Sequence, residues 1–267
     1  MRLRPIGGIV LRQFYLMRSS PIRVIPLFAW VAVDIVLWGF IARYLNSVSS
    51  GRIDFTAQLL GAVLFWDLFT RIMQGVTVAF LEDVWTRNFL TLFATPLRIS
   101  EYVAGLVISS ITTSLFGLLA MLVLATGVFG LDFLRLGVLL VPVVGLLFVF
   151  GIALGILASA MVLRWGPASE WLMWPIPALL APFAGVFYPV DTLPGWMQGV
   201  ASVLPPSYVF EALRATLAGR SVAAGPLLWG CGLALAQLVL SGVVFAAVHR
   251  YVMRIGLLAR YSAESVT

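Results

Sequence analysis

The sequence predicts an all-α polytopic membrane protein with six spanning helices, and three observations lead to this fold class. Hydrophobic residues make up 61% of the 267 positions, charged residues make up only 10%, and the mean hydropathy is +1.05. A soluble domain of this length keeps a charged surface and could not bury so much apolar area. Apolar stretches of about 20 residues recur along the chain, the length at which a helix crosses a hydrocarbon core of ~30 Å.

An interfacial amphipathic helix is predicted over residues 5–19, ahead of the first span. Its apolar residues recur at helical spacing and its arginines lie off that stripe: Ile6, Ile9, Val10, Phe14 and Met17 against Arg4, Arg12 and Arg18. Such a helix lies on the membrane surface among anionic headgroups. Pro21 is expected to end it, and a basic tail that only sets the topology is the alternative.

Six spans are expected within a single transmembrane domain that covers residues 1–267. They lie at about residues 24–44, 56–80, 103–129, 136–163, 171–188 and 226–248. The fifth is short and contains Pro175, Pro177 and Pro182. It is therefore expected to be broken, either as a simple kink or as a wall of a transport pathway.

Small residues recur at every fourth position in the fourth span, at Gly151, Gly155 and Ser159. This spacing lets a second helix approach closely. In a glycine-rich membrane protein the same spacing can also arise by chance.

The distribution of arginine predicts that both termini are cytoplasmic. The chain has no lysine, and with a cytoplasmic N-terminus eleven of its 17 arginines fall on the cytoplasmic side and five outside, with Arg71 inside the second span. This asymmetry follows the positive-inside rule. Residues 81–101 then form a cytoplasmic connection, and residues 187–219 face outward as a re-entrant amphipathic segment.

Several function classes are excluded by residues that the chain lacks. A P-loop needs a lysine that reaches the nucleotide phosphates, so the chain is not expected to hydrolyse ATP itself. Cys231 and His249 are the only residues of their types, which leaves no zinc site of the ordinary kind, and no metal site is expected. The arginines punctuate apolar spans and form no basic face for nucleic acid. A membrane enzyme that uses only Asp and Glu stays open as an alternative.

Three ionisable residues are predicted to lie deep in the membrane. Asp67 and Arg71 are four positions apart in the second span, so they share one face of its helix. Asp34 in the first span lies at a similar depth of about 15 Å, at 1.5 Å per residue. A charge in the hydrocarbon core costs at least ~2.5–3.5 kcal/mol, which favours an Asp34–Arg71–Asp67 cluster. Such a cluster fixes helix register, takes part in substrate passage or couples transport to protons.

The outward segment is expected to contain two short helices, over about residues 194–203 and after Pro205-Pro206, with Ser207 as the N-cap. Glu211 and Arg214 are three positions apart and can pair on the polar side of the second helix. Tyr188, Trp196 and Tyr208 are residue types that settle at a membrane interface, either as simple anchors or as part of a gate.

A series of short motifs resembles a known family. They are GVFYP at 185–189, LP at 193–194 with Trp196, LPP at 204–206, EALR at 211–214 and TPL at 95–97. Their order is similar to that in membrane subunits of ABC transporters of the type-2 exporter family, which includes drug, polysaccharide and lipooligosaccharide export permeases. The resemblance covers nearly the whole chain, and it assigns no role to Asp67 and Arg71.

The resemblance implies a half-transporter in the plasma (inner) membrane that pairs with a second copy and exports an amphipathic or lipid-linked substrate by alternating access. A separate ATP-binding-cassette subunit would hold ATP and Mg²⁺, and this chain would bind no cofactor itself. The residues implied in coupling to that ATPase are Glu82, Asp83, Thr86, Arg87, Phe89, Thr95 and Pro96. Those implied in the outer gate are Phe187, Tyr188, Pro189, Pro194, Trp196, Glu211 and Arg214. An ion-coupled secondary transporter that uses Asp34 or Asp67 is the alternative.

Overall fold

The computed structural model describes residues 3–48, 55–86, 88–130 and 137–256, and within these ranges it is almost entirely helical, which confirms the all-α fold class. The α-helices are α1 (Leu3–Ser19), α2 (Pro21–Val48), α3 (Phe55–Trp85), α4 (Asn88–Phe93), α5 (Ile99–Phe129), α6 (Leu140–Trp165), α7 (Glu170–Met173), α8 (Pro175–Ala184), α9 (Gly195–Ala201), α10 (Pro205–Leu217) and α11 (Ala224–Arg254). Short 3-10 helices include η2 (Pro167–Ser169) and η3 (Val190–Thr192).

Five helices of the described chain are long and apolar enough to cross a membrane: α2 from Ala29, α3, α5, the stretch Gly137–Trp165 that contains α6, and α11. They correspond to five of the six predicted spans. Residues 171–188, predicted as a broken fifth span, lie in the two short helices α7 and α8 and in the turn that follows them. Pro175 begins α8, where a proline fits the first turn, and Gly185 ends it with φ +61°. Neither piece is long enough to cross the bilayer alone.

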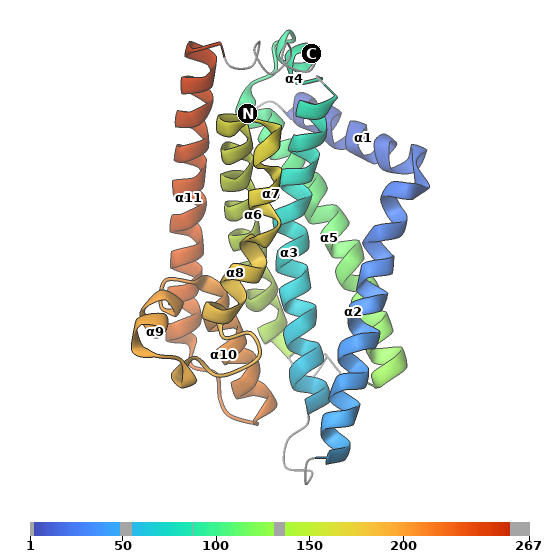
Figure 1. The fold of residues 1–267 in the computed structure, drawn as a ribbon, viewed down its shortest axis with the longest axis vertical. Helices are drawn as coiled ribbons and strands as arrows, with labels where there is room; N and C mark the ends of the chain where they lie inside the picture. The colour runs from blue at the N-terminus through green and yellow to red at the C-terminus, as the bar shows by residue number, and fades with distance from the viewer. Residues whose placement is uncertain (1–2, 49–54, 87, 131–136, 257–267) are drawn as a thin grey trace.

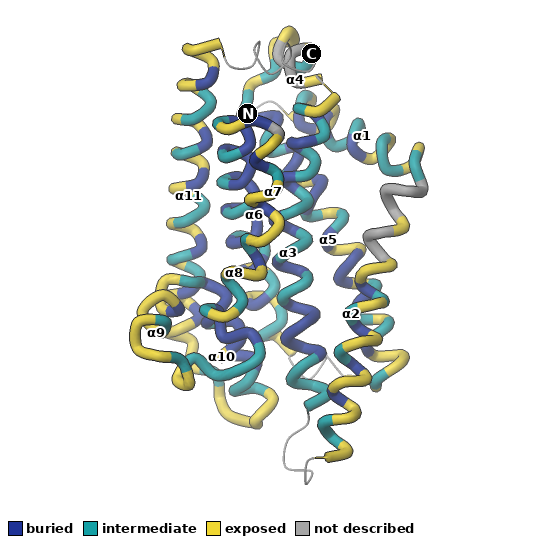
Figure 2. The backbone as a smooth tube through the Cα atoms, viewed as in Figure 1, coloured by how far each residue is buried: buried dark blue, intermediate teal, exposed yellow. Residues whose placement is uncertain are grey.

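Helix α3 is the centre of the bundle. It packs against α2, α5 and α6, and α6 in turn packs against α11. Figure 2 shows α3 and α6 buried along much of their length, while α2 and α11 expose their outer faces. These exposed faces are apolar, with large side chains such as Phe40 and Val239 on the surface. Apolar residues on the outside of a bundle match lipid as the surrounding solvent.

The two ends of the bundle carry different accessory helices. Helix α1 lies across the bundle at the end where α4 and the C-terminal end of α11 also lie, whereas α9 and α10 lie at the opposite end (Figure 1). The predicted interfacial helix and the predicted cytoplasmic connection therefore share one end, and the predicted outward segment is at the other.

The small residues of α6 do make a close helix contact. A methyl group on Gly155 would lie 2.8 Å from the carbonyl oxygen of Met73 in α3, and one on Gly151 would lie 2.9 Å from Ile72. The hydroxyl of Thr77 in α3 donates a hydrogen bond to the carbonyl oxygen of Gly155, at 3.2 Å. The spacing therefore does correspond to a close helix contact, and the structure identifies α3 as the partner helix.

The predicted outward segment contains the two expected short helices, α9 and α10. The prediction of Ser207 as the N-cap of the second was wrong, because Leu204 occupies the cap and Pro205 the first helical position. A proline at that position has no N–H to leave unsatisfied, so the two prolines begin the helix themselves and place Ser207 in its buried first turn.

Candidate functional site

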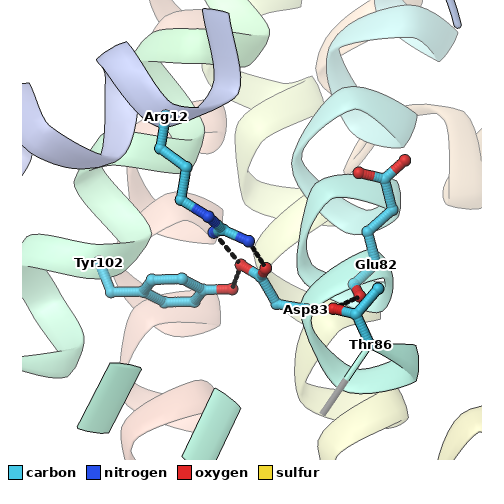
Figure 3. A network of polar contacts seen from close by, with 5 residues as sticks. All are labelled: Arg12, Glu82, Asp83, Thr86 and Tyr102. Atoms are coloured by element: carbon cyan, nitrogen blue, oxygen red, sulfur yellow. Dashed lines mark hydrogen bonds and ion pairs between the residues drawn. The ribbon is translucent and has the colours of Figure 1, made fainter. Parts of the chain in front are cut away.

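A buried ionic network joins three helices at the α1 end of the bundle. The carboxylate of Asp83 in α3 accepts hydrogen bonds from both terminal nitrogens of Arg12 in α1, of which the Nη1–Oδ2 distance is 2.9 Å. The same Oδ2 accepts a hydrogen bond from the hydroxyl of Tyr102 in α5, at 2.7 Å. Figure 3 shows the three side chains converging from their separate helices.

The length of α3 decides where Asp83 points. The helix was expected to end near residue 80, but it continues to Trp85. Asp83 therefore stands on a regular helical turn and faces α1 and α5, and only 1% of its side chain is exposed. The implied role of Asp83 as a surface contact for a partner does not match this placement. Its position suits it to hold α1 against the bundle.

The buried negative charge of Asp83 is compensated within this network. The hydrogen bonds to Asp83 raise the pKa of the Arg12 guanidinium above its ordinary value, so Arg12 stays charged at any physiological pH. A carboxylate that accepts two hydrogen bonds from a guanidinium and one from a phenol hydroxyl avoids the penalty that an unpaired buried charge would carry.

The other residues implied in coupling lie around this network. Thr86, Thr95 and Pro96 are exposed, and the Thr86 hydroxyl donates to the backbone carbonyl of Glu82 at 2.6 Å. The Glu82 side chain points away from Asp83 (Figure 3). Arg87 and the side chain of Phe89 lie outside the described residues.

The turn after α4 lies beside α1. Thr95, Pro96 and Leu97 line a hollow of about 320 Å³ together with Pro5, Gly8, Ile9 and Arg12. We call residues 86–96 the coupling segment: it begins at the end of α3 and ends beside α1, and Thr86, Thr95 and Pro96 at its two ends are exposed.

The predicted cluster of intramembrane charges forms in part. Arg71 Nε lies 2.6 Å from Asp67 Oδ2, and the arginine side chain extends over Gly117 of α5. Asp34 of α2 lines the same cavity as this pair. The cavity has a volume of about 540 Å³ and is lined by residues of α1, α2, α3 and α5 and by Trp174.

At the opposite end, Glu211 and Arg214 organise the turn that follows α8. Arg214 Nη2 lies 2.8 Å from Glu211 Oε1, as the spacing in the sequence predicted. Arg214 Nη1 also donates to the carbonyl oxygen of Gly185 at 2.7 Å, and Glu211 accepts from the backbone N–H of Val190 at 2.9 Å. A side chain at Gly185 would clash with Tyr188 and Val190, and its positive φ also favours glycine. The pair thus fixes both ends of the 185–190 turn.

The remaining residues implied in the outer gate surround this turn. Phe187 stacks on Trp38 of α2 with ring centroids 5.0 Å apart, and Trp196 of α9 meets Phe183 edge to face at 6.0 Å. The Tyr188 hydroxyl donates to the carbonyl oxygen of Pro182 at 2.8 Å. Pro189 caps η3 and Pro194 caps α9. Sequence reasoning quoted Gly185 only as the first residue of the GVFYP motif, and it missed Trp38, for which only the tertiary contact with Phe187 provides a signal.

No group of three or more His, Cys, Asp or Glu side chains that could hold a metal ion occurs in the described part of the chain. Residues 9–218 match the model of the ABC-2 type transporter family. The matched range begins within α1 and ends just after α10, so it includes the Asp83 network, the cavity and the 185–190 turn. No curated protein matches the chain.

Proposed function

The chain belongs to the ABC-2 type transporter family, and on this premise we propose that it is the membrane subunit of an ATP-driven exporter. A separate ATP-binding-cassette subunit would supply the energy. The substrate would be amphipathic or lipid-linked, as in the drug, polysaccharide or lipooligosaccharide branches of the family, and would leave the cytoplasm or the inner leaflet of the plasma membrane.

The observation that carries this proposal is the network of Arg12, Asp83 and Tyr102. It ties the interfacial helix α1 to two spanning helices directly beside the exposed coupling segment. A force applied to that segment by a docked ATPase would reach α1, α3 and α5 together, because a buried charge pair resists separation. This is a mechanical link of the kind that conversion of ATP hydrolysis into alternating access requires.

A second copy of the chain would complete the pathway. The broken α7–α8 region cannot cross the bilayer as one helix, and the cavity opens along a face that includes Trp30 and Trp174, both substantially exposed. We propose that two copies place these faces toward each other and that the 185–190 turn and α9 close the pathway on the outer side.

The test is to search the neighbouring reading frames for an ATP-binding-cassette gene and to reconstitute the chain with the protein that it encodes. We expect a stable complex, cross-linking of the variants Thr86→Cys and Thr95→Cys to the ATPase, and transport that stops when the Walker-A lysine of the ATPase is replaced. Transport by the chain without the ATPase, driven by an ion gradient, would contradict the proposal and favour the ion-coupled alternative. A cross-link at Gly199→Cys instead would place the ATPase at the wrong end.

A further inference from the structure

The 540 Å³ cavity is elongated and reaches from one end of the bundle toward the middle of the membrane. Its wall on α3 extends from Glu82 to Asp67, which is 15 residues or about 22 Å along a helix. Gln13 of α1 lines it, as do Trp30 and Asp34 of α2. This shape suits a long amphipathic molecule with one end near the α1 end of the bundle and the other end near Asp67.

The described residues that line this cavity have an excess of negative charge. Along the spanning helices, Asp34 and Asp67 supply two carboxylates, whereas Arg71 supplies one guanidinium. Arg71 is already paired with Asp67 at 2.6 Å. Low-dielectric walls strengthen the effect of a net charge on a ligand, so a lining with net negative charge favours cations over anions.

The cavity also contains polar atoms that lack a partner. Ser109 Oγ and Gln13 Nε2 are buried, with 8% and 4% of their residues exposed, and neither has a hydrogen-bond partner among the described residues. Buried polar groups nearly always have a partner, so a molecule in the cavity is expected to supply one. The serine hydroxyl can accept from an ammonium N–H, and the glutamine amide can donate to an oxygen.

We propose that this cavity is a binding site for amphipathic organic cations that carry both a protonated or alkylated nitrogen and an acceptor oxygen. Asp34 neutralises the cationic nitrogen, Ser109 and Gln13 satisfy its polar groups, and the exposed faces of Trp30 and Trp174 receive the aromatic part. The inference rests on the proposed function only in that the bound cation would then be the transported substrate. Binding itself requires neither ATP nor the ATPase.

The experiment compares two xanthene dyes of similar shape and opposite charge, the cationic rhodamine 6G and the anionic fluorescein. Each is titrated against the full chain in nanodiscs by fluorescence polarisation, with empty nanodiscs subtracted. We expect saturable binding of rhodamine 6G and none of fluorescein. The variant Asp34→Asn should weaken rhodamine binding by about tenfold or more, the scale expected for one charge pair in a partly desolvated site.

Three variants guard against misfolding. Asp191→Asn makes the same change at an exposed site in the outward segment and should leave binding unchanged. Asp34→Glu should restore most of the affinity, and Ser109→Ala should weaken it without a change in elution volume. Equal binding of both dyes, or wild-type affinity in a folded Asp34→Asn protein, would overturn the proposal.

Transport assays with the ATPase separate this inference from the proposed function. If rhodamine binds as described but ATP drives no transport, the cation site stands and the proposed exporter role fails. If ATP drives transport of another compound while Asp34→Asn has no effect on rhodamine binding, the exporter role stands and the cation site fails.

Discussion

The guanidinium of Arg12 in α1 and the carboxylate of Asp83 in α3 form a two-nitrogen ion pair across 71 positions of sequence. Asp83 is almost fully buried, whereas about a quarter of the Arg12 side chain reaches solvent. Removing Arg12 and removing Asp83 therefore have different consequences for the charge that remains. Arg12 without Asp83 can turn to water, but Asp83 without Arg12 keeps a buried charge whose remaining hydrogen-bond donor among the described side chains is Tyr102.

This asymmetry predicts that Arg12→Gln destabilises the protein more than Asp83→Asn does. We expect a loss of about 3–5 kcal/mol in the free energy of unfolding for Arg12→Gln, the usual cost of a buried charge without its partner. Tyr102→Phe should cost about 1.5–3 kcal/mol, because it removes one hydrogen bond to a charged group. Unfolding of the detergent-solubilised protein measures all three. Arg18→Gln, at the exposed end of α1, serves as the control and should change little.

The close contact between α3 and α6 predicts a different outcome for two glycines of the same helix. Gly155→Ala would place a methyl group 2.8 Å from the Met73 carbonyl oxygen, so we expect the melting temperature to fall. Gly145→Ala meets nothing within 4 Å, and it should be neutral or slightly stabilising because alanine favours the helix. Thermal unfolding of the two variants side by side is the measurement. Equal shifts would show that the interface can relax around the extra methyl group.

The pair of Asp67 and Arg71 predicts that two substitutions do less harm than one. Arg71→Met leaves the Asp67 carboxylate uncompensated in the bundle and should destabilise by about 3 kcal/mol or more. Asp67→Leu combined with Arg71→Met removes both charges and should recover most of that loss. Transport by the folded double variant then separates two roles. Retained transport indicates a pair that fixes helix register, and lost transport indicates a part in substrate passage or ion coupling.

Local patterns in the sequence predicted much of the fold. The apolar spans, the α3–α6 stripe and the pairs Asp67–Arg71 and Glu211–Arg214 depend only on spacing along one helix, which the sequence displays directly. The break at the fifth span was likewise visible in its prolines.

Tertiary relationships were not visible in the same way. Asp83 stands at the polar end of an apolar run and was placed among the residues that couple to the ATPase, because nothing local indicates that Arg12 and Tyr102 meet it. Similarly, Gln13 and Ser109 are unremarkable in the sequence, and only the packing of α1 on α5 leaves them buried beside a cavity.

The separation of the two ends of the bundle predicts opposite membrane sides for Thr86 and Gly199. Both are exposed, and a side chain at Gly199 would meet nothing within 4 Å, so a cysteine at either place should be reactive and harmless. Cys231, the only native cysteine, is first replaced by alanine. A membrane-impermeant maleimide should then label Gly199→Cys in intact cells, and Thr86→Cys only after the cells are opened. Reaction of both positions from the same side would show that the α1 end and the α9–α10 end do not lie on opposite sides of the membrane. The proposed export pathway would then be wrong.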